Sequence, residues 1–112
     1  MSSDAFETLS SDQLVTASGG FGAQLTTAMH RARELGLRIT ATTNGKHVAH
    51  SYHYQGRAAD VAGKPAAMRE FFREMAGTHP TELFYDPMGA YKNGHNLHRS
   101  IGGHGNHVHV AY

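Results

Sequence analysis

Histidine and carboxylate groups are the chemically active side chains of this chain, which has ten histidines and no cysteine in 112 residues. Six of the histidines fall in two clusters, 47–53 and 104–109, and Asp60 follows the first cluster. Imidazole nitrogens and carboxylate oxygens are ligands that favour zinc or a harder divalent ion. Lone histidines are usually ordinary surface residues, and four are interpreted in that way: His30, His79, His95 and His98.

The last six residues, "HVHVAY", alternate polar and apolar side chains as a half-buried strand does. His107 and His109 would therefore project from one face, while Val108 and Val110 would face the core. Both imidazoles could bind one ion, or one could bind it while the other transfers protons. A catalytic zinc site has three protein ligands and an open position for water. His53, Asp60 and one histidine of this pair would supply that number.

The elements that position these groups belong to one domain, the usual outcome for this length. We expect residues 1–18, rich in serine, threonine and aspartate, to be a loose N-terminal segment, and residues 19–112 to form the domain. Apolar residues at helical spacing predict helices over 21–36 and 65–77. Alternation predicts strands over 37–42, 57–62, 81–87 and 107–112.

Residues 88–106 hold several glycines, asparagines and histidines, and we expect them to be a long irregular loop. Two main helices and about four strands joined by uneven loops predict an α+β fold. Its small sheet would be mostly antiparallel.

The composition of the chain argues against several classes of protein. The net charge of +1 with neutral histidines gives no case for binding nucleic acid. No apolar run is long enough for a membrane span. The N-terminus is polar and acidic, so we expect no signal peptide on this chain. The absence of cysteine removes disulfides and thiolate ligands, and is compatible with either redox compartment.

Two motifs together resemble one family. "S-x-H-x-x-G-R-A-x-D" over 51–60 and "H-x-x-H-x-H-V" over 104–110 are similar to zinc D-Ala-D-Ala carboxypeptidases, murein endopeptidases and hedgehog-type domains. The likeness runs from about Leu37 to the last residue. It is strongest to peptidase domains of phage tail tape-measure proteins and of phage or actinobacterial lytic enzymes. The resemblance implies a hedgehog/DD-peptidase-like fold and a Zn²⁺ cofactor.

The resemblance also implies roles for individual residues. His53, Asp60 and His109 would be the zinc ligands, and His107 or His104 would be the catalytic acid–base group. Other residues would line the site or bind substrate: His50, Ser51, Tyr52, Arg57 and Tyr91.

The chain departs from the resemblance in two places. The carboxypeptidase branch has a glutamate shortly before the last ligand, where this chain reads "GGHGNHVHV" without an acid. Proton transfer would therefore fall to a histidine, whose pKa lies near neutrality. Relatives often carry an arginine for a substrate carboxylate after the first strand, where this chain has Thr43, Asn44 and Lys46.

The expected function is a zinc metallopeptidase that hydrolyses an amide bond in peptidoglycan stem peptides or cross-links, as a carboxypeptidase or endopeptidase. It would act at the cell wall, whether extracellular, periplasmic or virion-associated, as an endolysin or phage tail enzyme. It would be a monomer or part of a larger phage or bacterial protein. The alternatives are a zinc-containing module that binds cell wall without cutting it, and a structural domain of a phage tail.

Overall fold

The computed structural model describes residues 22–42 and 56–112. The predicted N-terminal segment 1–18 lies outside these residues. Within the described residues, two helices and six strands follow one another: α2 (Ala23–Glu34), β1 (Arg38–Ala41), β2 (Ala58–Ala62), α3 (Pro65–Ala76), β3 (Glu82–Tyr85), β4 (Gly89–Lys92), β5 (His95–Asn96) and β6 (Val108–Ala111). The fold is α+β, as predicted.

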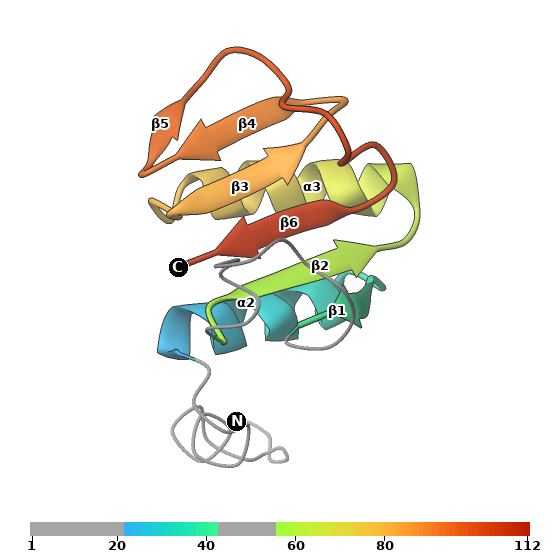
Figure 1. The fold of residues 1–112 in the computed structure, drawn as a ribbon. Coiled ribbons are helices and arrows are strands. Elements are labelled where there is room, and N and C mark those ends of the chain that lie inside the picture. The colour runs from blue at the N-terminus through green and yellow to red at the C-terminus, as the bar shows by residue number, and fades with distance from the viewer. Residues whose placement is uncertain (1–21, 43–55) are drawn as a thin grey trace.

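All six strands form one sheet in the order β1-β2-β6-β3-β4-β5 (Figure 1). Every neighbouring pair of strands is antiparallel. The C-terminal strand β6 lies between β2 and β3, although α3 separates β2 from β3 along the chain. This insertion brings three distant segments of sequence together at the middle of the sheet.

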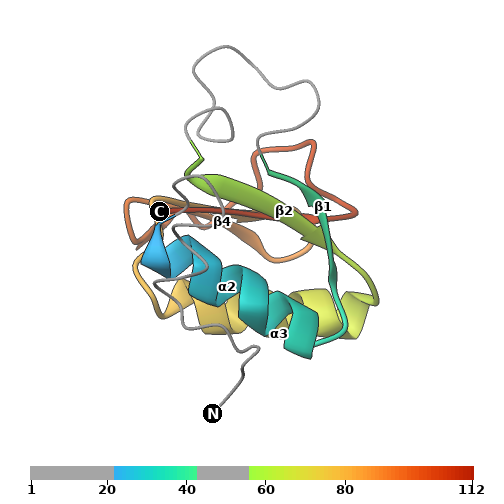
Figure 2. The ribbon, with the colours of Figure 1, turned by 90° about the horizontal axis from the view of Figure 1, so that it is seen from below.

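Both helices cover the same face of the sheet (Figure 2). The apolar stripe of α3 consists of Met68, Phe71, Phe72 and Met75, which are all buried. It packs in one core cluster with alternate residues of the central strands, among them Ala59, Val61, Leu83, Tyr85, Val108 and Val110. The intervening residues of the same strands must point to the other face, which the helices leave uncovered.

An ion pair links the two helices. The guanidinium group of Arg31 on α2 donates two hydrogen bonds to the Glu74 carboxylate on α3, at 2.7 Å and 2.8 Å. These bonds lower the pKa of Glu74 to about 2. The two-pronged contact joins α2 to α3, while the apolar core packs both helices against the sheet.

The prediction of an irregular loop over 88–106 is wrong for its first half. Residues 89–96 form the hairpin of β4 and β5, which raises the number of strands from about four to six. Asn93 and Gly94 connect these strands with φ values of 51° and 78°. Asparagine and glycine accept such positive φ values, which a tight hairpin turn needs at both central positions.

The four predicted strands are confirmed, each within two residues at either end. None of the helices in the described residues is long and apolar enough to cross a bilayer.

Candidate active site

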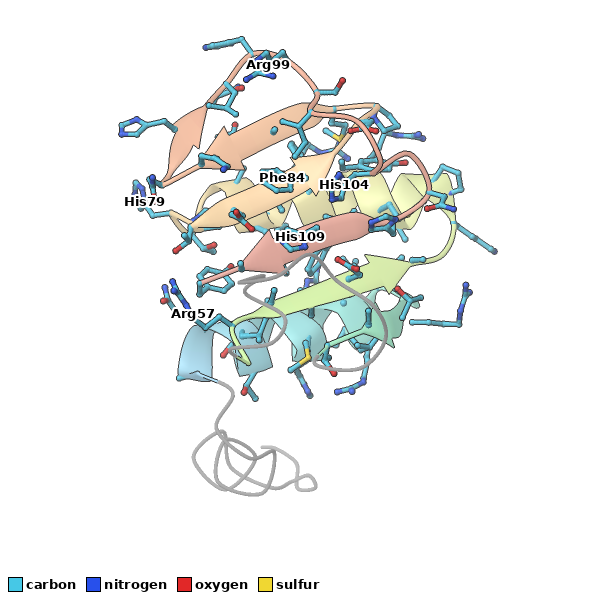
Figure 3. The ribbon with its side chains drawn as sticks, viewed as in Figure 1. Arg57, His79, Phe84, Arg99, His104 and His109 are labelled. Carbon is cyan, nitrogen blue, oxygen red and sulfur yellow. The ribbon has the colours of Figure 1, made fainter. Side chains whose placement is uncertain are left out.

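Three side chains form a row across the uncovered face of the sheet. Asp60 on β2 lies directly opposite His109 on β6, and His109 lies directly opposite Phe84 on β3. Residues paired in this way project to the same face. Figure 3 shows Phe84, His104 and His109 gathered on the side of the sheet away from the helices.

His109 is the buried centre of this row, with 6% of its surface exposed. Its Nδ1 lies 3.1 Å from Oδ1 of Asp60, and its Nε2 lies 2.8 Å from Oε1 of Glu82. Burial opposes protonation of the ring, but the two carboxylates outweigh it and raise the pKa of His109. When the ring is protonated, it donates one hydrogen bond to each carboxylate.

The Asp60–His109 pair offers two donor groups of the kinds that zinc binds, at a spacing that can be compared with that of zinc ligands. A neutral imidazole and a carboxylate are both common zinc ligands, each bound at about 2.0–2.1 Å. Two such ligands on a tetrahedral ion lie roughly 3.3 Å apart. The observed 3.1 Å between Oδ1 and Nδ1 is close to that spacing, so the ion could replace the shared proton with little movement.

Of the three predicted ligands, Asp60 and His109 are brought together, and His53 lies outside the described residues. Within 22–42 and 56–112, no group of three or more histidine, aspartate or glutamate side chains is arranged to hold a metal ion. The pair is therefore the part of the predicted ligand set that the structure describes.

His104 is anchored beside the pair by Asp86. The Asp86 carboxylate accepts hydrogen bonds from the backbone N–H groups of Gly102 and His104, at 3.1 Å and 2.8 Å. The N–H group of Asp86 donates to the carbonyl oxygen of His104. The side-chain Nδ1 of His104 donates to the carbonyl oxygen of Gly102 at 2.8 Å. In the neutral ring this leaves the Nε2 lone pair as a proton acceptor.

The ring of His107, like that of His104, makes its hydrogen bond through Nδ1. Its Nδ1 donates to Oδ1 of Asn106 at 2.8 Å, so its neutral ring also presents Nε2 as the acceptor. Burial lowers the pKa of His107, which keeps the ring neutral near pH 7. The ring centroid of His104 lies 5.0 Å from that of His107 and 5.7 Å from that of His109. Of the two predicted acid–base candidates, His104 thus adjoins the predicted ligand His109, and His107 lies next to His104.

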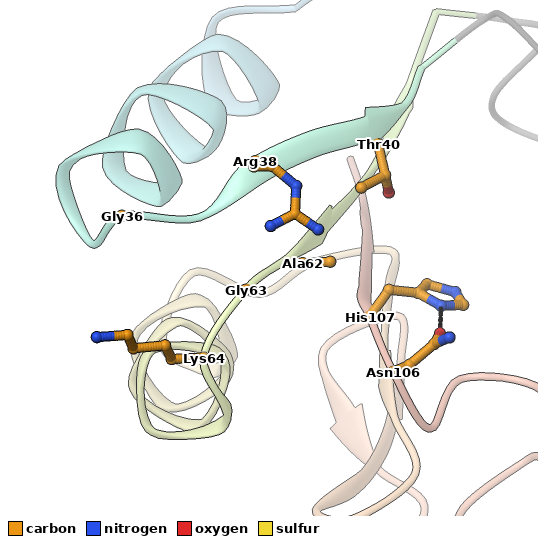
Figure 4. Close-up of a pocket in the computed structure, with 8 residues that line it drawn as sticks. All are labelled: Gly36, Arg38, Thr40, Ala62, Gly63, Lys64, Asn106 and His107. Carbon is orange, nitrogen blue, oxygen red and sulfur yellow. Dashed lines mark hydrogen bonds between the residues drawn. The ribbon is translucent and has the colours of Figure 1, made fainter.

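A surface cavity of about 770 Å³ opens beside His107. Its lining comes from β1, the end of β2 and the segment before β6: Gly36, Arg38, Thr40, Ala62, Gly63, Lys64, Asn106 and His107. Arg38 extends from β1 over Ala62 toward the segment that carries His107, whereas the ammonium group of Lys64 points away (Figure 4). Arg38 has no ion-pair partner among the described residues. The lining of the cavity therefore includes both the ring of His107, a proton acceptor, and the guanidinium group of Arg38, a cation.

The structure does not bring all the predicted lining residues to this face. Tyr91 pairs with Leu83 on the helix-covered side, where its ring lies 5.8 Å from that of Phe72. Arg57 donates from Nε to the carbonyl oxygen of Tyr112 at 2.7 Å, beyond the far end of β6 from His107. His50, Ser51 and Tyr52 lie outside the described residues, as His53 does.

Glu82, Phe84 and Asp86 contribute to the site and were not predicted from the sequence. The ring of Phe84 stacks on that of His109 with a centroid distance of 5.1 Å and an interplanar angle of 12°. The three residues alternate in "ELFYD", which places Glu82 and Phe84 on one face. That alternation was visible in the sequence, but pairing of β3 with β6 was not.

Comparisons with known proteins found no match from which a function could be inferred. No protein-family model, no curated protein and no solved structure matches this chain. The function must be inferred from the residues themselves.

Proposed function

We propose that this chain is a zinc-dependent peptidase that hydrolyses an amide bond in peptidoglycan stem peptides or cross-links. The observation that carries the proposal is the 3.1 Å contact between Oδ1 of Asp60 and Nδ1 of His109, with His107 and His104 beside it. The motifs of the sequence add the likeness to zinc D-Ala-D-Ala carboxypeptidases and murein endopeptidases.

Asp60 and His109 would hold the ion, and His53 would be the third ligand by the resemblance. Bound zinc would polarise the scissile carbonyl and lower the pKa of a coordinated water to about 7. The carboxylate of Asp60 would offset part of the ion's charge. Phe84 stacks on His109 and keeps the ring plane fixed.

Proton transfer would fall to His107 or His104, since each presents an Nε2 lone pair when neutral. The lowered pKa of His107 favours it as the group that accepts a proton from water near pH 7. The same residue could then return the proton to the leaving amine.

The cavity beside His107 would accommodate the peptide. Stem peptides carry carboxylates, and the guanidinium group of Arg38 is a suitable partner for one of them. The sequence put capture of a substrate carboxylate in doubt, because residues 43–46 contain no arginine. Arg38 would supply that function from a different position, on β1.

The test is hydrolysis of purified sacculi and of muropeptides of known structure. The protein is assayed with added zinc, with a chelator, and with zinc restored after the chelator is removed. Mass spectrometry of the released fragments identifies the bond, with candidates at D-Ala–D-Ala, L-Ala–D-Glu and diaminopimelate cross-links. We expect fragments that require zinc.

The outcomes separate the alternatives. Zinc-dependent fragments support the peptidase. Bound zinc without any fragment, together with sedimentation of the protein with sacculi, would indicate a wall-binding module. A protein that neither retains zinc nor cuts would contradict the proposal and leave a structural domain of a phage tail.

A further inference from the structure

Glu82 is the second carboxylate that contacts His109. It begins β3 and pairs with Ala111, two residues after His109 on β6. Its Oε1 lies 2.8 Å from Nε2 of His109, and its side chain is 21% exposed. The other oxygen, Oε2, lies 3.9 Å from Nζ of Lys92. The carboxylate therefore lies at the edge of the site with one oxygen directed at the buried ring.

The two carboxylates contact different nitrogens of the same ring. Asp60 contacts Nδ1 and Glu82 contacts Nε2, from strands on opposite sides of β6. The ring of Phe84 stacks on the imidazole. A flip of the imidazole would put a carbon in the place of each nitrogen and so break both carboxylate contacts. A carboxylate at Nε2 stabilises a proton there.

We propose that Glu82 is the positioning residue of the metal site, which keeps Nε2 of His109 protonated and so directs Nδ1 at the ion held with Asp60. The inference deepens the proposed function and rests on its metal site. Metal-binding histidines commonly donate their second N–H to a carboxylate, which fixes the tautomer and increases the basicity of the ligand nitrogen. Asp60, His109 and Glu82 have this arrangement across three adjacent strands.

The register distinguishes this role from that of a catalytic base. His107 comes just before β6, whereas Glu82 pairs with Ala111, two residues beyond His109. Glu82 and the proton-accepting histidines therefore lie toward opposite ends of the strand. The carboxylate acts through His109.

The test compares Glu82→Gln and Glu82→Leu with the full-length protein. The probe is Zn²⁺ itself, and its affinity is measured by competition with a chromophoric chelator. Glutamine keeps an oxygen that accepts from Nε2–H but loses the charge, whereas leucine loses the acceptor. We expect affinity to fall in the order wild type, Glu82→Gln, Glu82→Leu, with a loss of about 10-fold or more for leucine.

Glu70→Leu is the matched control, because Glu70 lies on α3, where its carboxylate accepts a hydrogen bond from Arg73 at 3.1 Å. A second readout is the Nε2–H resonance of His109 in ¹⁵N-labelled, zinc-loaded protein. We expect a slowly exchanging signal in the wild type, a retained signal in Glu82→Gln and a lost or rapidly exchanging one in Glu82→Leu. Should Glu82→Leu fail to fold, the reduced affinity of Glu82→Gln decides the proposal.

Zinc affinity in the Glu82 variants equal to that of Glu70→Leu would overturn the role of Glu82, and the peptidase proposal would stand. Zinc binding that depends on Glu82 without hydrolysis of sacculi would overturn the peptidase and support the positioning role. A wild-type protein without affinity for zinc would overturn both.

Discussion

Asp60 and His109 meet across β2 and β6 with Oδ1 and Nδ1 3.1 Å apart, although 49 positions separate them in the chain. Their side chains are 16% and 8% exposed. A carboxylate and an imidazole this close and this buried form a strong site for either a proton or a cation. Zinc affinity and its pH dependence distinguish a site for a proton from a site for a cation.

Loss of His109 should affect metal binding, whereas loss of His107 should affect catalysis. We expect His109→Ala to abolish both zinc retention and hydrolysis. His107→Ala should keep most of the zinc but lower kcat by about 10²-fold or more, the usual contribution of an acid–base group. Metal analysis and a turbidity assay of sacculi measure the two effects. The control is His95→Ala, an exposed position on β5; undiminished zinc in His109→Ala would disprove the ligand assignment.

Zinc affinity should decrease in acid because of His109. Its pKa is raised, so a proton competes with the ion at Nδ1 at a higher pH than for an ordinary histidine. Below that raised pKa, affinity should fall by about tenfold per pH unit. The lowered pKa of His107 means that its ring is still neutral there, so loss of the metal and not of the base should set the acid limb of activity.

Chelator competition from about pH 8 to about pH 5, beside the pH profile of kcat/KM, measures this. A flat affinity over that range would contradict the prediction. In the zinc-free protein, stability of the fold depends on pH in the opposite direction from zinc affinity. There the protonated His109 stabilises the fold at low pH, and this contribution is lost as the pH rises through the raised pKa.

Arg38 should affect binding of substrate more than chemistry. We expect Arg38→Gln to raise KM for carboxylate-bearing muropeptides by about 10-fold with little change in kcat, since a charged hydrogen bond contributes about 1.5–3 kcal/mol. Arg33→Gln is the control, because Arg33 is an exposed arginine in the last turn of α2. Equal KM values for the two variants would show that the cavity does not bind the substrate through Arg38.

The sequence determined the elements and the faces of the central strands. The helical spacing of Met68, Phe71, Phe72 and Met75 was enough to define α3. The alternation in "HVHV" was enough to place the two histidines on one face of the sheet and the two valines on the other. These are local patterns, set by the periods of helix and strand. The same local logic was available for the Asn93–Gly94 turn, but the glycine-rich composition around it hid the hairpin.

The tertiary structure decided which strands lie together. Insertion of β6 between β2 and β3 places Asp60 on one side of His109, and Glu82 and Phe84 on the other. Strand order and register depend on how both helices pack against the whole sheet, and this packing cannot be predicted from the sequence of a single strand. The motifs of the sequence therefore predicted Asp60 and His109 as ligands, whereas the contact of Glu82 with the second ring nitrogen of His109 became visible only from the pairing of three distant strands.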